Sequence, residues 1–179
     1  MENIIIKQFI SRPQSSQDDA VLSSLKPNNS FAGGKMSIGT MPYANVKFAI
    51  RLLSKIDSWD TMVRLFEICF DVSASEFWDA SIIDYYQARA FMLSEFQRVI
   101  NTESKMMASQ STDEHLWVMA GADRLKPYSD TLPLIQLGKL FGLYPFDIGR
   151  KPYNEVFNML VQIKVQSEVE TEYQKLKSK

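Results

Sequence analysis

Apolar residues recur at steps of three and four along most of the chain after residue 42, which is the spacing of helices with one buried face. The longest such pattern covers residues 81–107, where Ile82, Tyr85, Phe96 and Val99 share a face and no Gly or Pro interrupts. Further helical patterns begin after Pro42, Ser58, Ser73, Thr112, Asp130 and Pro152. The spacing therefore predicts a chain built mainly from helices.

Residues that cap helices stand where these patterns begin and end. Ser73 and Glu76 have the spacing of a capping box, in which the hydroxyl and the carboxylate each accept a backbone N–H. Ser58 is placed to cap the following helix, and Gly142 to end a helix in the left-handed conformation. The caps support the helical interpretation and fix the approximate boundaries.

Residues 1–41 differ from the rest in composition. An apolar cluster of Ile4, Ile5, Ile6 and Phe9 is followed by a stretch rich in Ser, Gln, Asn, Asp, Gly and Pro. Such a stretch buries too little apolar surface to fold by itself. We therefore expect an extended N-terminal arm or linker over residues 1–41 and a helical domain over residues 42–179.

Together, these patterns predict an all-α protein. We expect a compact multi-helix bundle of about six helices, with the extended N-terminal arm and minor β structure at most.

Charge and cysteine content limit the classes of partner. The charges of the 20 basic and 21 acidic residues nearly cancel, and the basic residues are scattered. The sequence therefore predicts no basic patch that would bind nucleic acid or an anionic membrane. No apolar run approaches the roughly 20 residues that span a bilayer. We expect no membrane partner and no specific nucleic acid. The single Cys69 lies in an apolar string and is expected to be a buried, unreactive thiol.

One glycine-rich segment has some features of a phosphate-binding loop. In that motif a Gly precedes the Gly-Lys pair by five residues and Ser or Thr follows the Lys. Here Asn29 and Met36 occupy those positions around Gly34-Lys35. A turn is the better interpretation.

The ionisable residues do not form a recognisable catalytic or metal-binding pattern. Asp113, Glu114 and His115 would point around the start of a helix, where acidic residues favour the helix dipole. Carboxylate pairs such as Asp79 with Asp84, or Glu168 with Glu170, are typical of a solvated face. We expect no catalytic residue, no metal and no cofactor, and hence no enzyme.

Large aromatic side chains are numerous, and some are expected at an interface. A row such as Phe77, Trp78 and Tyr85 could stack nucleic-acid bases, but few cations accompany it, so packing is the better explanation. Aromatic residues and Met are enriched at protein interfaces. We expect partner contacts at the following residues: Ile4, Ile5, Ile6, Phe9, Trp78, Tyr144, Phe146, Tyr153 and Tyr173.

Four segments in the C-terminal half carry a resemblance. They are Trp117–Leu125 (WVMAGADRL), Leu137–Gly142 (LGKLFG), Pro145–Ile148 (PFDI) and Pro152–Phe157 (PYNEVF), followed by a charged final helix. In this arrangement the chain resembles small helical assembly proteins of tailed bacteriophages. It is similar to tail-assembly chaperones in style, and to adaptor or ring proteins of the head–tail junction in helical architecture.

The resemblance implies a non-enzymatic structural protein. It would be an oligomeric virion component that contacts itself and other phage structural proteins, located in the virion and, during assembly, in the host cytoplasm. A transient tail-assembly chaperone is an alternative, although the N-terminal arm departs from that pattern. A small helical enzyme with a cleft near His115 and Asp123, or a nucleic-acid-binding protein, are further alternatives.

Overall fold

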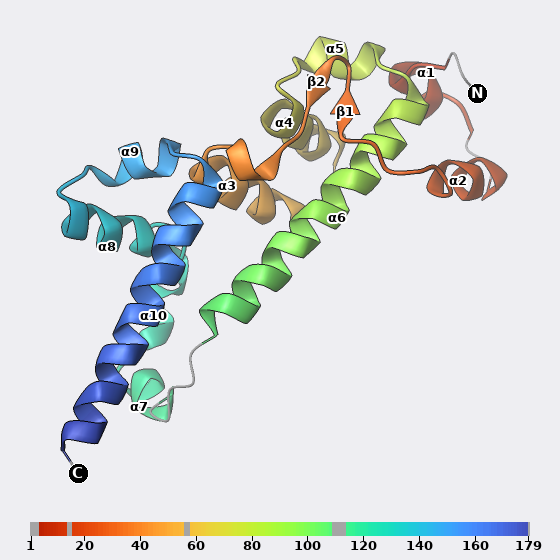
Figure 1. Ribbon diagram of the computed structural model, residues 1–179. Helices are drawn as coiled ribbons and strands as arrows, with labels where there is room; N and C mark the ends of the chain where they lie inside the picture. Colours follow the sequence, from red (N-terminus) through yellow and green to blue (C-terminus); the bar gives the residue numbers. More distant parts are fainter. Residues whose placement is uncertain (1–3, 14–15, 56–57, 109–113, 179) are drawn as a thin grey trace. The chain divides into compact units, whose positions relative to one another are not determined.

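The computed structural model describes residues 4–13, 16–55, 58–108 and 114–178 (Figure 1). In this part of the chain it contains ten α-helices, two short 3-10 helices and one two-stranded hairpin, so the predicted all-α class is confirmed. The number exceeds the expected six mainly because the sequence pattern did not predict three of the helices, α1, α2 and α9. The helices are α1 (Ile6–Ile10), α2 (Ser16–Ser23), α3 (Tyr43–Leu53), α4 (Trp59–Phe70), α5 (Ala74–Asp79), α6 (Ile82–Met107), α7 (Glu114–Met119), α8 (Leu132–Phe141), α9 (Pro145–Arg150) and α10 (Tyr153–Lys177). The hairpin is β1 (Ser30–Phe31) with β2 (Gly34–Lys35), and the 3-10 helices are η1 (Ile38–Thr40) and η2 (Ala122–Tyr128).

The helix ends follow the predicted caps. The Ser58 hydroxyl accepts the Thr61 amide at the start of α4, and Ser73 with Glu76 forms a complete capping box at the start of α5. Gly142 ends α8 in the left-handed conformation, with φ +65°. These predictions are confirmed. They could be made from the sequence because each cap depends on residues only a few positions apart.

The chain divides into two compact units of similar length. The first unit comprises residues 1–38 and 48–100, and the second comprises residues 39–47 and 101–179. This division differs from the expected one into an arm over residues 1–41 and a domain over residues 42–179. Residues 1–38 belong to the same unit as α4 and α5.

Aromatic rings form the centre of the first unit. Phe66 of α4 is fully buried, and its ring lies 4.6 Å from that of Phe31, 5.1 Å from that of Phe77 and 5.4 Å from that of Tyr85, measured between centroids. These rings come from β1, α4, α5 and α6. Edge-to-face and offset pairs add to the stabilisation that burial itself provides.

The N-terminal residues are tied into this unit by backbone hydrogen bonds. The Ile6 amide donates to the Ala80 carbonyl and the Ile82 amide to the Ile4 carbonyl, both at 2.9 Å. The side chains of Ile6 and Phe9 are buried. At residues 4–9, the expected arm therefore contributes to the core instead of remaining extended.

The glycine-rich segment forms the turn of the β-hairpin. Ser30 pairs with Lys35 and Phe31 with Gly34, so Ala32 and Gly33 make a two-residue loop. Both have positive φ, +46° and +85°, as a type I′ turn requires. Gly34 lies against the end of α4, where an added Cβ would be 1.8 Å from the Phe70 carbonyl oxygen.

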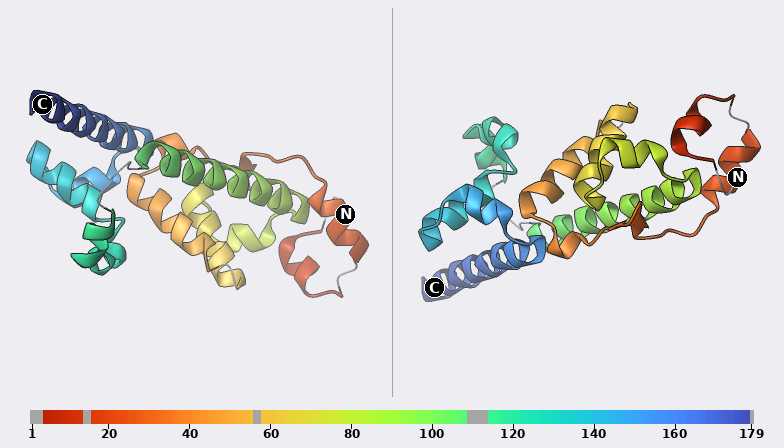
Figure 2. Two further views of the ribbon diagram at one scale, coloured as in Figure 1. Left: turned by 90° about the horizontal axis from the view of Figure 1, so that it is seen from below. Right: turned by 90° about the horizontal axis from the view of Figure 1, so that it is seen from above.

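The second unit is organised around the beginning of α10. Pro42 and Pro152 form an antiparallel bridge in which the Tyr43 amide donates to the Lys151 carbonyl and the Tyr153 amide to the Met41 carbonyl. From this point α10 continues as one unbroken helix to Lys177, seen in blue in both views of Figure 2.

The hairpin gives a direct test of how residues 1–41 are used. Phe31 contacts the rings of Phe66, Phe70 and Phe77, so we expect Phe31→Ala to lower the free energy of unfolding by about 3–5 kcal/mol. Urea unfolding followed by circular dichroism measures this change. Val21→Ala, at an exposed site in the same segment, is the matched control and should change stability by less than about 0.5 kcal/mol. Equal effects of the two substitutions would show that the hairpin is not part of the core.

Candidate protein-interaction surface

Exposed apolar side chains are distributed unequally between the two units. Of the 21 large apolar residues that are exposed in the described part of the chain, only four lie in the first unit. The other 17 lie in the second unit, on α7, η2, α8, α9, α10, the end of α6 and the connection between α8 and α9. Such a concentration marks a surface that binds other proteins more often than a surface that stays in water.

The densest part of this surface is the corner, residues 140–146, which joins α8 to α9. Its five large residues are all exposed, and Tyr144 and Phe146 retain 64% and 70% of their accessible surface. The rings of Tyr144 and Phe146 lie 5.4 Å apart between centroids. The five residues are Leu140, Phe141, Leu143, Tyr144 and Phe146.

The backbone of the corner is tightly turned. The amides of Gly142 and Leu143 both donate to the Gly138 carbonyl, and Pro145 begins α9 at a position where its missing N–H costs nothing. A Cβ on Gly138 would lie 2.7 Å from the Leu143 carbonyl oxygen. Close packing of this backbone leaves the large side chains to point outward.

The inner side of the α8–α9 pair is buried and anchors the corner. Leu134 and Leu137 of α8 and Ile148 of α9 are buried. Gly149 lets α9 approach its neighbours, because a Cβ there would meet Ala44 and Leu134 at 3.4 Å. The pair thus has one apolar side inside the unit and a second apolar side in solvent.

The first turns of α10 are held by a stack of rings and an ion pair. Tyr153 stacks on Tyr43 at 5.9 Å and on Phe157 at 5.6 Å between centroids, with nearly parallel planes. The Tyr153 hydroxyl donates to Glu103 Oε1 at 2.9 Å, and Lys47 Nζ lies 2.5 Å from Glu103 Oε2. Burial is the main cause that raises the pKa of Tyr43, and the negative charges of Glu103 and Asp130 raise it further.

A second hydrogen bond holds α10 further along its length. One turn past Leu160, Lys164 Nζ donates to the Met106 carbonyl at 2.9 Å.

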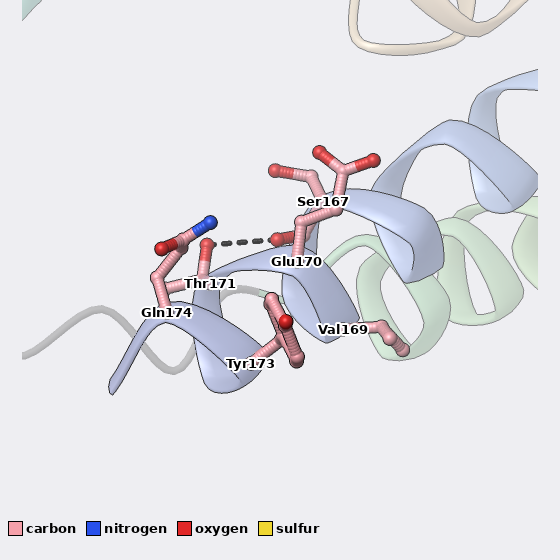
Figure 3. A pocket seen from close by; sticks show the side chains of 6 residues that line it. All are labelled: Ser167, Val169, Glu170, Thr171, Tyr173 and Gln174. Atoms are coloured by element: carbon pink, nitrogen blue, oxygen red, sulfur yellow. Dashed lines mark hydrogen bonds between the residues drawn. The ribbon is translucent and has the colours of Figure 1, made fainter. Parts of the chain in front are cut away.

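Beyond residue 164, α10 has an exposed apolar face. We call Val165, Val169, Tyr173 and Leu176 the α10 stripe; all four are exposed. Figure 3 shows a shallow hollow on this part of the helix, lined by Val169 and Tyr173 together with polar neighbours. All six lining residues come from α10 itself, so the hollow is a feature of one helix surface.

The residues predicted as contact sites divide into exposed and buried ones. Tyr144, Phe146 and Tyr173 are exposed, and Trp78 is half-buried, lining a shallow hollow with Lys7, Ile10, Ser75 and Asp79. Ile4 and Ile5 are also half-buried. By contrast, the side chains of Ile6, Phe9 and Tyr153 are buried within the chain and present no surface to a partner.

Several exposed residues were not among the predicted contact sites. Leu140, Phe141 and Leu143 of the corner belong to this group, as do Val165, Val169 and Leu176 of the α10 stripe. The signal for the corner was present in the sequence. A run of large apolar residues across a Gly-Pro corner exceeds what one buried helix face can hold.

The ionisable residues considered as catalytic or metal-binding candidates lie on the surface wherever the structure describes their side chains. His115, Asp79 and Asp84 are exposed, and Asp113 lies outside the described residues. Glu168 pairs with Lys164 at 3.1 Å, and Glu170 accepts a hydrogen bond from Gln166 at 2.8 Å. Within the described part of the chain, no three His, Cys, Asp or Glu residues are grouped to hold a metal ion.

None of the helices in the described ranges combines the length and apolar character needed to cross a membrane. Comparison of the chain with protein-family models, with curated protein sequences and with solved structures gave no match.

Cys69 offers a test of the packing of α4. Burial raises the pKa of its thiol to about 12, so very little of the reactive thiolate exists at pH 8. We expect the folded protein to react with an aromatic disulfide reagent far more slowly than a free thiol does, and to react fully once unfolded in guanidinium. Rapid labelling of one thiol per chain under native conditions would contradict the buried placement.

Proposed function

We propose that this chain is a non-enzymatic assembly protein of a tailed bacteriophage, an oligomeric virion component that acts through protein–protein contacts. The observation that carries the assembly role is the concentration of exposed apolar side chains on the second unit, above all at the corner. An apolar surface of this kind gains free energy when a partner covers it.

The phage assignment has a separate support. It rests on the resemblance of residues 117–157 and the charged final helix to head–tail adaptor, ring and tail-assembly proteins. The exposed corner, residues 140–146, covers the end of LGKLFG and the start of PFDI. We therefore place the protein at the head–tail junction or in the tail, in contact with itself and with other phage structural proteins.

Light scattering of the full chain at micromolar concentration tests the assembly role. We expect a mass that is a multiple of 20.6 kDa. The double substitution Tyr144→Ser with Phe146→Ser should shift the mass towards that of one chain, since both rings are mostly exposed and would be covered in an oligomer. Phe48→Ser, at an exposed position of the first unit, is the matched control and should leave the mass unchanged. A wild-type chain that stays monomeric and binds no phage structural protein would contradict the proposal.

The same corner would serve a transient tail-assembly chaperone, so a second measurement separates the two roles. A virion component remains in the mature particle, whereas a chaperone leaves it. We expect mass spectrometry of purified particles of the encoding phage to detect this chain in stoichiometric amounts. Its absence from particles, together with its presence in infected cells, would favour the chaperone.

A further inference from the structure

The α10 stripe is a continuous apolar face on the last turns of a helix. Its residues follow one another at steps of four, four and three, so at 100° per residue they fall within an arc of about 80°. On the same face one and two turns earlier stand Gln162 and Asn158, which are polar and exposed. The apolar face is therefore confined to residues 165–176.

Charged residues flank this stripe in a regular order. One flank carries Glu172 followed by Lys175, and the other carries Glu170 followed by Lys177. All four side chains are exposed. On both flanks the acidic residue comes first and the basic residue lies nearer the end of the helix. A helix face with this polarity is complementary to itself when two copies run in opposite directions.

We propose that residues 165–177 of α10 pair in antiparallel orientation with the same residues of a second copy of this chain, with the two-fold axis at Tyr173. In this register Tyr173 faces Tyr173 of the second copy. Val169 lies opposite Leu176 of the second copy, with an offset of one residue along the helix. Glu172 comes level with Lys175 of the other copy, and Glu170 with Lys177, again within one residue. The Tyr173 contact is formed once, on the axis, whereas the Val169–Leu176 contact and the two opposite-charge contacts are each formed twice.

The same charges favour the antiparallel arrangement over the parallel one. In a parallel pair, one flank of the first helix faces the other flank of the second, and the contact joins a residue to one about five positions further along. Glu172 would then approach Lys177, whereas this geometry gives Glu170 and Lys175 no opposite charge. The antiparallel pair forms two kinds of opposite-charge contact in place of one, so the charge order favours it.

The contact is small. Three apolar residues from each copy cover much less than the roughly 1,600 Å² of a standard stable interface. We therefore expect a weak contact that forms when other contacts hold the copies together, since this raises the effective concentration of one α10 near the other. The inference deepens the proposed function, because it names the partner of one part of the surface.

Disulfide formation between engineered cysteines tests orientation and register. In a Cys69→Ser background, a mixture of Val169→Cys chains and Leu176→Cys chains of distinguishable size should form the mixed disulfide on mild oxidation. The Val169→Cys chain alone should form little, because its two sulfurs would be separated by about 12 Å along the helix axis. Thr171→Cys, on the opposite side of the helix, is the control and should remain reduced. Circular dichroism confirms that each variant keeps its helices.

Charge reversal provides a second measurement. We expect Lys175→Glu to reduce the yield of the mixed disulfide about five- to tenfold, and the added Glu172→Lys to restore it, since the two residues face each other across the pair. A disulfide from the Val169→Cys chain alone, or no disulfide in any mixture, would overturn the antiparallel pairing. If light scattering still showed an oligomer that depends on Tyr144 and Phe146, the proposed function would stand without it.

Discussion

Two backbone hydrogen bonds around Pro42 and Pro152 are the constraint on which the second unit depends. They join residues that are far apart in sequence and place the first turns of α3 and α10 side by side. Proline donates no backbone hydrogen bond, so the donors are the next residues, Tyr43 and Tyr153. Their rings then stack on each other, and Tyr153 reaches Glu103. The start of α10 is thereby fixed, and with it the base from which the apolar stripe extends.

The first unit depends on a different kind of interaction. Its centre is a set of aromatic rings contributed by four elements, with Phe66 in contact with most of them. Burial of large rings supplies most of the stabilisation here. The N-terminal residues take part in it, because Phe31 belongs to the cluster and Phe9 is buried in its surroundings. One unit is thus held by apolar packing, and the other adds a half-buried ion pair and hydrogen bonds to its stacked rings.

The local features of the fold could be predicted from the sequence. The capping box at Ser73, the cap at Ser58 and the end of α8 at Gly142 depend on residues within a few positions of one another. The burial of side chains from residues 1–41 in the core could not be predicted in this way. Phe31, Met36 and Ile38 are too few to form a core, but they are enough to complete one whose other members come from α4, α5 and α6. Composition measures what a segment can bury by itself, not what it adds to a core formed by others.

For the candidate surface, too, local sequence patterns allowed only part of the result to be predicted. Tyr144, Phe146 and Tyr173 were predicted as contact residues and are exposed, whereas Tyr153 was predicted on the same grounds and is buried. Tyr144, Phe146 and Tyr153 all stand at the start of a helix, so the local pattern does not separate the two exposed residues from the buried one. The difference lies in Tyr43 and Glu103, which no local spacing connects to Tyr153.

The close approach of Gly34 to the end of α4 has a consequence for the order of folding. A hairpin of two-residue strands has too few hydrogen bonds to be stable alone. Its docked position depends on the end of α4, since the Gly34 backbone lies directly against the Phe70 carbonyl group. We expect α4 to form first and the hairpin to dock afterwards. A segment early in the sequence would then be among the last to reach its native position.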